Sequence, residues 1–363
     1  MGICALTACG PLVKPGGSRP PVEARIVAAE RSAGGVHLVM VDENGERLAD
    51  VTTPPLDGER RFIVDAQPAW SPDGKWIAFA SNRRGEGTSI WVVAARAEIE
   101  PRPVTVAHGA SVDRDPAWSP DGDALVFTSN RGGDSYDLWR VELVAGDDQW
   151  PEAKSVPVQL TQLTADAVSP AWSPDGRSLA FAQFDRGQRM STLWVADARG
   201  RNPRQLTEGP LDQTPAWSPD SDWVAYSAPS RDRNDLDIYV IKRDGTRVRL
   251  AIDEPIANET EPAWSADGVH LFATAVLRNE KTGAPFFWSI VLIDTEEPAR
   301  VRALHDPSAV ARVGFALAPT PLRRDDLRGL PAYDRDAVLE ALRDLCAELP
   351  QEDLPDACKR LQR

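Results

Sequence analysis

The chain has 363 residues, with 41 basic and 55 acidic side chains and a formal net charge of −14. Such an acidic chain repels phosphate backbones, which argues against nucleic acid as a partner. No apolar run is long enough to span a bilayer, and no dinucleotide, phosphate-loop or metalloprotease motif is present. The cysteines stand only near the two ends, so the body of the chain does not depend on disulfides.

The N-terminal residues resemble the lipid-attachment motif of bacterial lipoproteins, because Leu6, Thr7 and Ala8 precede Cys9. In that motif the cysteine is lipidated after the signal segment is removed, which makes Cys9 the expected lipidation site. Residues 11–23 are rich in proline and glycine and are expected to form a flexible tether. Only eight residues precede Cys9, without a basic segment. Either translation starts further upstream, or this is an ordinary disordered terminus of a cytoplasmic protein.

One heptapeptide, PAWSPDG at residues 68–74, recurs along the chain. Further copies lie at 116–122, 170–176, 215–221 and 262–268, the last two with one change each. Their tryptophans are Trp70, Trp118, Trp172, Trp217 and Trp264, at steps of 48, 54, 45 and 47 residues. A period of about 40–50 residues is typical of propellers and other repeat arrays. The Ala-Trp pair is expected to end a strand, and Ser-Pro-Asp-Gly to form a tight turn.

Each copy of the turn begins a unit of further strands. Alternating apolar strands follow it at residues 76–80, 124–128, 178–182, 223–227 and 270–274. A polar hairpin such as 81–85 leads to a third strand, such as 89–93, and short edge strands are expected at 157–161 and 203–207. A four-stranded sheet with two apolar faces is stable only when packed against neighbours around an axis. We therefore expect the repeat tryptophans to fill the space between blades.

The first unit lacks its own repeat. Residues 25–29, 37–41 and 46–50 match the second, third and fourth strands of a blade, and residues 311–319 stand where a further innermost strand would fall. We expect the late strand to complete the first blade, which removes open sheet edges. The sequence thus predicts an all-β, six-bladed β-propeller over residues 25–320, with four-stranded antiparallel blades, preceded by a signal remnant and tether at 1–24.

Residues 321–363 are predicted to form a C-terminal helical extension. One helical stripe is formed by Val338, Leu342, Leu345 and Leu349. A short second helix is expected near Pro355. Cys346 and Cys358 fall one on each helix and would bridge them in an oxidising compartment; the alternative is two free thiols.

The PAWSPDG turns, the Ser-Asn-Arg hairpins at 81–83 and 129–131 and the Gln-Leu-Thr edge strands together resemble the TolB-like propeller repeat. The resemblance covers residues 25–319 and concerns the propeller part alone. Related repeats occur in the periplasmic Tol–peptidoglycan-associated-lipoprotein system and in prolyl oligopeptidases. The resemblance implies a propeller fold and a protein-binding role in the bacterial envelope, but no G-x-S-x-G hydrolase motif is present.

A set of carboxylates stands just before the innermost strands: Asp65, Asp113, Asp166, Asp212 and Glu259. They should ring one mouth of the central channel, on the face of the hairpins that carry Arg83, Arg84 and Arg131. Such a rim would attract a cation or a basic segment. The alternative is that each carboxylate accepts hydrogen bonds in its local turn and holds the start of the strand. Reversing the charge of Asp65 and Asp113 together would separate the two: a binding rim predicts weaker partner capture at an unchanged melting temperature.

The sequence therefore predicts a non-catalytic, envelope-associated protein, without a cofactor, that captures a protein or peptide at the channel mouth. It would be periplasmic or anchored to the outer membrane by its lipid. One alternative is a carbohydrate-active or carbohydrate-binding propeller with a divalent cation in the channel, although the scattered histidines argue against it. His37 and His270 lie in strands and are expected to be packed. The other alternative is a cytoplasmic scaffold.

Overall fold

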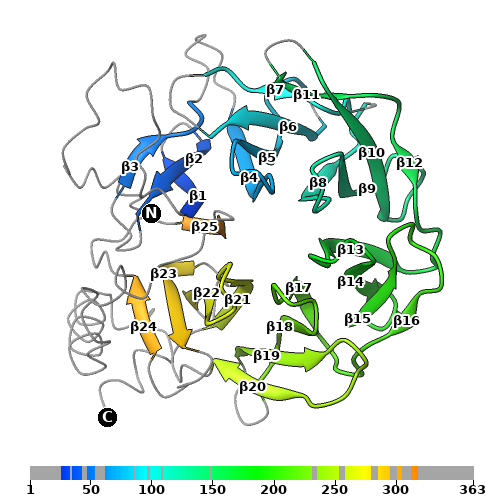
Figure 1. Cartoon of the computed structure of the whole chain (residues 1–363), viewed down its shortest axis with the longest axis vertical. Coiled ribbons are helices and arrows are strands. Elements are labelled where there is room, and N and C mark those ends of the chain that lie inside the picture. Colours follow the sequence, from blue (N-terminus) through cyan, green and yellow to red (C-terminus); the bar gives the residue numbers. More distant parts are fainter. Residues whose placement is uncertain are drawn as a thin grey trace.

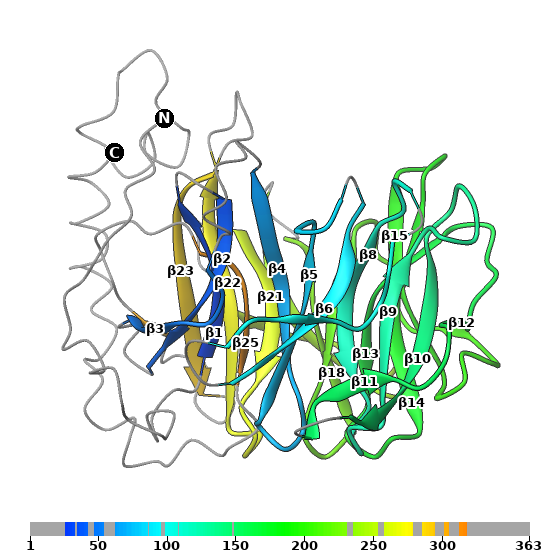
Figure 2. The same ribbon diagram turned by 90° about the horizontal axis from the view of Figure 1, so that it is seen from above.

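The computed structural model describes residues 26–32, 35–42, 47–53, 62–85, 87–95, 99–107, 109–146, 149–230, 235–252, 258–278, 285–294, 301–304 and 312–317. Within these ranges the chain forms strands β1 to β25 and no α-helix. Figure 1 shows the strands gathered into small sheets around a common axis, and Figure 2 shows the same sheets from above. The predicted all-β propeller fold is confirmed.

Most of the sheets consist of consecutive antiparallel strands, the first of which lies nearest the axis (Figure 1). We call each group a blade and name it by its innermost strand. The β4 blade contains β4 (Ile63–Trp70), β5 (Trp76–Ser81), β6 (Ser89–Ala94) and β7 (Arg102–Pro103). The β8 blade contains β8 (Asp113–Trp118), β9 (Ala124–Ser129), β10 (Asp137–Ala145) and, at its edge, β12 (Val158–Gln159).

The later blades repeat this order. The β13 blade contains β13 (Asp166–Trp172), β14 (Ser178–Asp185), β15 (Met190–Asp197) and β16 (Arg204–Gln205). The β17 blade contains β17 (Gln213–Trp217), β18 (Trp223–Pro229), β19 (Leu236–Lys242) and β20 (Arg249–Ile252). The β21 blade contains β21 (Asn258–Trp264), β22 (His270–Arg278), β23 (Pro285–Asp294) and β24 (Val301–Leu304).

The two ends of the described chain share one blade. β25 (Arg312–Leu317) pairs antiparallel with β1 (Ile26–Ser32), with Ala28 opposite Phe315. β1 pairs with β2 (Gly35–Val41), which pairs with β3 (Arg47–Asp50). The pairing expected between the late strand and the first one is therefore present for residues 312–317 and 26–30, and we call this group the β25 blade.

The β8 blade has one strand more than the four that the repeat predicts. β10 is nine residues long and pairs with β12 near its middle and with β11 (Pro151–Ala153) at its end. The additional hairpin occupies the longest step between repeat tryptophans. It carries Trp150, which is 4 % exposed and meets Trp76 of the β4 blade edge-on, with the ring centroids 4.6 Å apart. The insertion thus adds a contact between the β8 and β4 blades.

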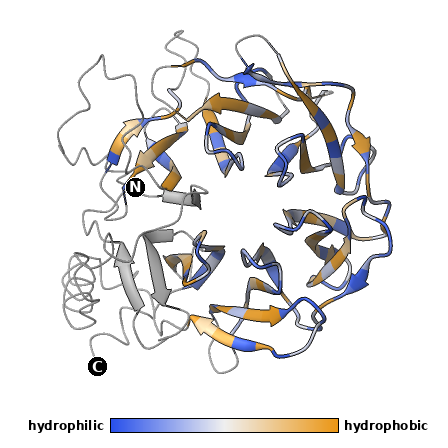
Figure 3. Cartoon of the chain, in the orientation of Figure 1, coloured by the Kyte–Doolittle hydropathy of each residue, from blue (hydrophilic) through white to orange (hydrophobic). Residues whose placement is uncertain are grey.

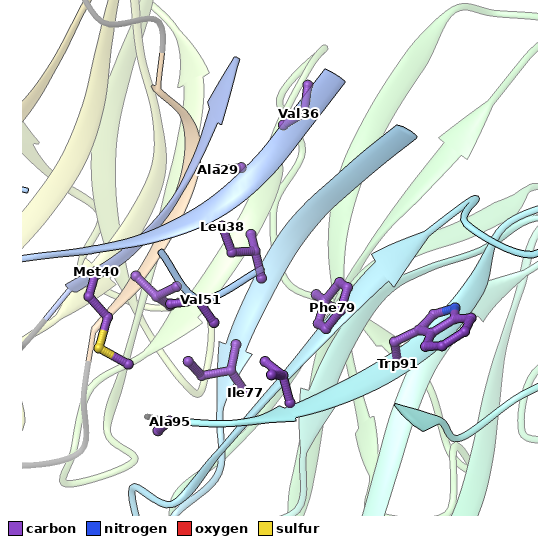
Figure 4. Close-up of a cluster of buried hydrophobic side chains, with 11 residues drawn as sticks. Ala29, Val36, Leu38, Met40, Val51, Ile77, Phe79, Trp91 and Ala95 are labelled. Atoms are coloured by element: carbon purple, nitrogen blue, oxygen red, sulfur yellow. The ribbon is translucent and has the colours of Figure 1, made fainter. Parts of the chain in front are cut away.

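The hydrophobic core lies between the blades, because each sheet is apolar on both faces. Along β5 the side chains alternate in direction, as in any strand. Ile77 and Phe79 pack against the β25 blade, and Ala78 and Ala80 pack against the β8 blade. Figure 4 shows Leu38 of the β25 blade facing Ile77 and Phe79 in the space between the two blades. In Figure 3 the strands are mainly apolar and the turns mainly hydrophilic.

The repeat tryptophans fill the space between blades, as predicted. Trp118 and Trp217 are each 7 % exposed and belong to inter-blade clusters. The Nε1 of Trp118 donates to the carbonyl oxygen of Ala69 at 3.1 Å, and that of Trp217 donates to Ala171 at 3.1 Å. Each bond joins the inner strand of one blade to that of its neighbour, so these tryptophans hold adjacent blades in register.

The Ser-Pro-Asp-Gly turns are closed by their own side chains. The Ser71 hydroxyl donates to Asp73 at 2.7 Å and accepts the amide of Trp76 at 2.9 Å. The turn ends in a left-handed residue, Gly74 with φ +69°, where a side chain would be strained. In the fourth copy Ser221 takes this conformation with φ +64°.

No helix among the described residues has the length and apolar character needed to cross a bilayer. The predicted lipidation site Cys9, the tether at 11–23 and the helical extension at 321–363, with Cys346 and Cys358, lie outside the described residues.

Candidate functional site

The carboxylates predicted to ring the channel mouth lie at the starts of the innermost strands, but their side chains are covered by protein. Asp65, Asp113 and Glu259 are 0 % exposed, Asp212 is 3 % and Asp166 is 5 % exposed. Burying a carboxylate is costly unless cations and hydrogen-bond donors surround it. The partners of these groups therefore decide between a binding role and a structural role.

Asp65 is held entirely within its own blade. The Ser81 hydroxyl donates to Asp65 Oδ1 at 2.6 Å, and Arg83 Nη2 donates to Oδ2 at 2.6 Å. The Arg83 side chain is only 9 % exposed and lies over the rings of Phe79 and Trp91. Arg84 lies over the same Trp91 ring, 5.3 Å from its centroid.

The β8 blade repeats this arrangement with an additional donor. Asp113 accepts hydrogen bonds from the Ser129 hydroxyl at 2.7 Å and the Thr105 hydroxyl at 2.6 Å, and from Arg131 Nη2. The Arg131 side chain is 7 % exposed. A Ser-Asn-Arg hairpin thus supplies a hydroxyl and a guanidinium to the carboxylate across the same pair of strands.

The carboxylate of the β13 blade is paired with a different arginine. Asp166 accepts bonds from Arg186 Nε at 2.6 Å and Nη2 at 2.9 Å, and from the backbone amide of Tyr136 at 2.9 Å. The β14 strand continues to Asp185, so the hairpin that follows it begins later within its own blade than the Ser-Asn-Arg hairpins begin within theirs. Arg186 takes the role that Arg83 and Arg131 have in the earlier blades.

Asp212 has neutral partners. It accepts the backbone amide of Gly209 at 3.1 Å and a hydrogen bond from Thr207, and no described residue forms an ion pair with it. Burial raises the pKa of the Asp212 carboxyl, and the bonds from Thr207 and Gly209 oppose that rise. Glu259 lies opposite Ala275 in the β21 blade.

For Asp65, Asp113 and Asp166 the described contacts favour the structural alternative: these side chains hold the starts of their inner strands. His37 and His270 are packed as expected, at 7 % and 8 % exposed. That the rim also contacts a partner remains a prediction.

A second set of polar residues, missed by the sequence reasoning, lies further along the innermost strands. We call it the axial belt, and it consists of Gln67, Asp115, Ser169, Thr214 and Glu261. Each member is partly exposed and has a φ between +51° and +56°. Each lies at a bulge, where two residues of the inner strand oppose one of its neighbour. A left-handed conformation costs a residue with a side chain about 1–2 kcal/mol.

The belt residues are joined across blades. The Gln67 side-chain amide donates to Asp115, whose own backbone amide donates to Gln67 Oε1 at 3.2 Å. The backbone amide of Ser169 donates to Asp115 Oδ2 at 3.3 Å. Asp115 therefore links the β4, β8 and β13 blades.

The other belt residues have partners in their own blades. The Thr214 hydroxyl lies 2.8 Å from that of Ser227, and the Thr274 hydroxyl donates to Glu261 at 3.2 Å. Burial raises the pKa of the Asp115 carboxyl, although Arg114, whose Nε lies 3.6 Å away, works against that rise. The belt thus offers carboxylates, which accept hydrogen bonds, and amide and hydroxyl groups, which can both donate and accept them.

The signal that could have revealed the belt is a polar residue directly before the repeat proline in every copy. Sequence reasoning passed over it because the left-handed bulge is a property of the paired sheet. Among the described residues no three His, Cys, Asp or Glu side chains converge in a way that could hold a metal ion.

Comparisons with known proteins agree on the architecture. A family model described as the TolB beta propeller domain matches residues 24–149 and 154–301. TolB from Acinetobacter baumannii superposes with a TM-score of 0.62 at 18% identity, covering 82% of this chain and 67% of that chain. A putative TolB from Agrobacterium tumefaciens has a TM-score of 0.55 at 19% identity, covering 79% and 90%.

A chain of a nidogen–laminin complex is similar as well, with a TM-score of 0.58 at 13% identity and coverage of 81% and 98%. At such identities the likeness concerns the fold alone. None of the curated protein sequences matches the chain.

Proposed function

This chain belongs to the TolB beta-propeller family, and on that premise we propose that it is a non-catalytic binding protein that captures a protein or peptide at the mouth of its channel. The proposal includes a closed ring of six blades over residues 25–320. It also includes a helical extension at 321–363, with a Cys346–Cys358 bridge. The protein would act in the bacterial envelope, tethered by a lipid on Cys9.

The axial belt is the observation that carries this proposal. Left-handed conformations at non-glycine residues are rare, and they recur in proteins where backbone strain serves a site. Here the strain falls on polar, partly exposed residues of neighbouring inner strands, such as Gln67 and Asp115. Such groups suit the alternating donors and acceptors of a peptide backbone.

In this proposal the rim supports the site. Asp65 and Asp113, with Arg83 and Arg131, fix the inner strands two residues before the belt and so set the position of Gln67 and Asp115. The partner contacts the belt and the partly exposed groups around it.

The test combines a belt variant with site-specific cross-linking. The double variant Gln67→Ala/Thr214→Ala removes two belt side chains and leaves the rim intact. We expect it to lose capture of envelope proteins while its melting temperature stays within a few degrees of that of the parent. A photo-cross-linker at position 67 should label the captured partner. The same group at Val156, an exposed residue at the outer edge of the β8 blade, should not.

Two results would overturn the proposal. Undiminished capture by the double variant would place the binding surface elsewhere. Loss of capture when a chelator is added, or a sugar-cleaving activity that a chelator abolishes, would favour the alternative, a carbohydrate-directed propeller with a divalent cation. Intact-mass measurement of protein from membranes tests the lipid on Cys9 separately.

A further inference from the structure

A basic surface, different in composition from the belt, lies at one end of the β13 and β17 blades. It is formed by the turns that precede β14, β16, β18 and β20, at residues 175–177, 197–204, 220–222 and 242–250. These segments carry eight basic side chains and five carboxylates, although the whole chain has a net charge of −14. We call this surface the basic face.

Contacts between blades make the basic face continuous. Arg204 of the β13 blade donates to the carbonyl oxygen of Arg243 in the β17 blade. Arg243 in turn reaches back to Asp175 at 2.7 Å and to the Ser178 hydroxyl at 2.7 Å. The two turns are therefore adjacent in space, although they are separated by 39 residues in the chain.

Part of the positive charge is neutralised within the face, and part is not. Arg201 pairs with Asp197 and Arg243 with Asp175. The side chains of Arg199 and Arg247 are exposed and form no ion pair among the described residues. Asp244 is bonded to Thr246 in its own turn, and its pKa is lowered by those bonds and then by the nearby cations Lys242 and Arg204.

Apolar side chains stand between these cations. Val248 is 49% exposed and Leu250 is 48% exposed, and they alternate with Arg247 and Arg249 along the edge of the β17 blade. Two cations contact the Trp223 ring, with Arg249 4.4 Å and Lys242 5.7 Å from its centroid.

We propose that the basic face docks on an anionic membrane surface, with Arg199 and Arg247 meeting lipid phosphates and Val248 and Leu250 entering the headgroup layer. Arginines bind phosphate, and basic side chains near an anionic leaflet each add to the attraction. Free phosphate would engage only the cations, whereas a bilayer interface accommodates the apolar side chains as well. At physiological salt the charges of acidic groups elsewhere on the chain are screened beyond about 8 Å, so the charge of the basic face itself decides whether it binds. This docking is independent of the belt and of any lipid on Cys9.

The test is sedimentation of the purified, unlipidated full chain with vesicles. Vesicles that contain phosphatidylglycerol should bind it, pure phosphatidylcholine vesicles should not, and salt of about 0.5 M should release it. Arg199→Glu/Arg247→Glu should weaken binding about thirtyfold or more. Arg189→Glu is the matched control, because Arg189 is exposed, shares the φ of 55° of Arg247, and lies at the other end of the β13 blade.

The apolar contribution has its own pair of variants. Val248→Thr/Leu250→Thr should weaken binding about threefold, through lost burial of methyl groups. Val156→Thr/Val158→Thr, at an exposed apolar edge of the β8 blade outside the basic face, should bind like the parent.

Equal binding by the Arg199→Glu/Arg247→Glu variant, equal binding to neutral vesicles, or no binding to anionic vesicles would each overturn the proposal. The last result, combined with binding of an acidic protein to the same arginines, would assign the face to protein recognition instead.

Discussion

Arg131 donates to Asp113 across a single hairpin, and both side chains are buried, at 7% and 0% exposed. The same relationship joins Arg83 to Asp65 in the preceding blade. The same ion pair thus recurs at the start of two successive inner strands. Contacts within each blade, and not a bound partner, therefore hold these strands in place.

Removing one member of this pair should cost stability. Arg131→Met leaves the Asp113 carboxylate buried without its cation, and we expect a loss of about 3–5 kcal/mol in the free energy of unfolding. Denaturant titration measures it. The double variant Asp113→Leu/Arg131→Met removes both charges and should recover much of the loss. By the same reasoning, reversing Asp65 and Asp113 should unfold the protein. Normal stability with lost capture would instead support the binding rim.

The left-handed glycines of the repeat turns should be sensitive to a side chain. Gly122 has φ +77°, and a Cβ there would meet only Pro72, at 4.0 Å, so backbone strain is the whole effect. We expect Gly122→Ala to cost about 1–2 kcal/mol, measured by thermal or denaturant unfolding. Gly85→Ala is the control, because that site is open and needs no positive φ. Equal losses at both positions would contradict this account.

The contact between Arg243 and Asp175 should appear as a pH-dependent stability. Burial opposes ionisation, yet hydrogen bonds from Ser173, the Arg177 amide and Arg243, and the charge of Arg243, lower the pKa of Asp175 from 3.8 to about 2. Because this folded pKa lies below the unfolded value, the stabilisation is present above about pH 4 and is lost as the pH falls toward 2.

Arg243→Met should therefore cost about 0.5–1 kcal/mol at neutral pH, since both side chains are partly exposed. The difference from the parent should vanish near pH 2. Arg199→Met, which removes a cation without an ion pair, should show no such pH dependence. A difference that stays constant through the acid range would point to packing rather than charge.

The pairing of β25 with β1 allows closure of the ring to be tested by a cross-link. Ala28 and Phe315 are direct partners across the two strands. Oxidation of Ala28→Cys/Phe315→Cys, with the native cysteines replaced by serine, should form a disulfide and stabilise the protein by about 5 kcal/mol in the chain-entropy account. The reduced form is the control. Failure of the disulfide to form would contradict the closed ring.

Much of the fold could be predicted because each repeat has the same requirement: both apolar faces of its sheet must pack against neighbouring blades. The spacing of the tryptophans identified the units, and a residue such as Trp118 at a strand end has only the inter-blade space to fill. The pairing of residues 311–319 with 25–29 followed from a missing inner strand.

The site was less predictable because it depends on relations between blades. The acidic positions were found, but their burial was not, since the cover over Asp65 is supplied by Arg83 from the hairpin between β5 and β6. The role of Arg186 could not be predicted because it depends on the length of β14. The basic face could not be predicted because it depends on a contact between Arg204 and Arg243, which belong to different blades. β11 was missed because its segment matches no repeat.

The position of β25 also affects synthesis of the protein. β1 emerges from the ribosome long before Arg312–Leu317, its partner on the axial side. Until those late residues appear, the first blade lacks a strand and Ala28 has an open edge beside it. Folding in the order of translation would therefore begin with the β4 blade, and the β25 blade would be the last to become complete.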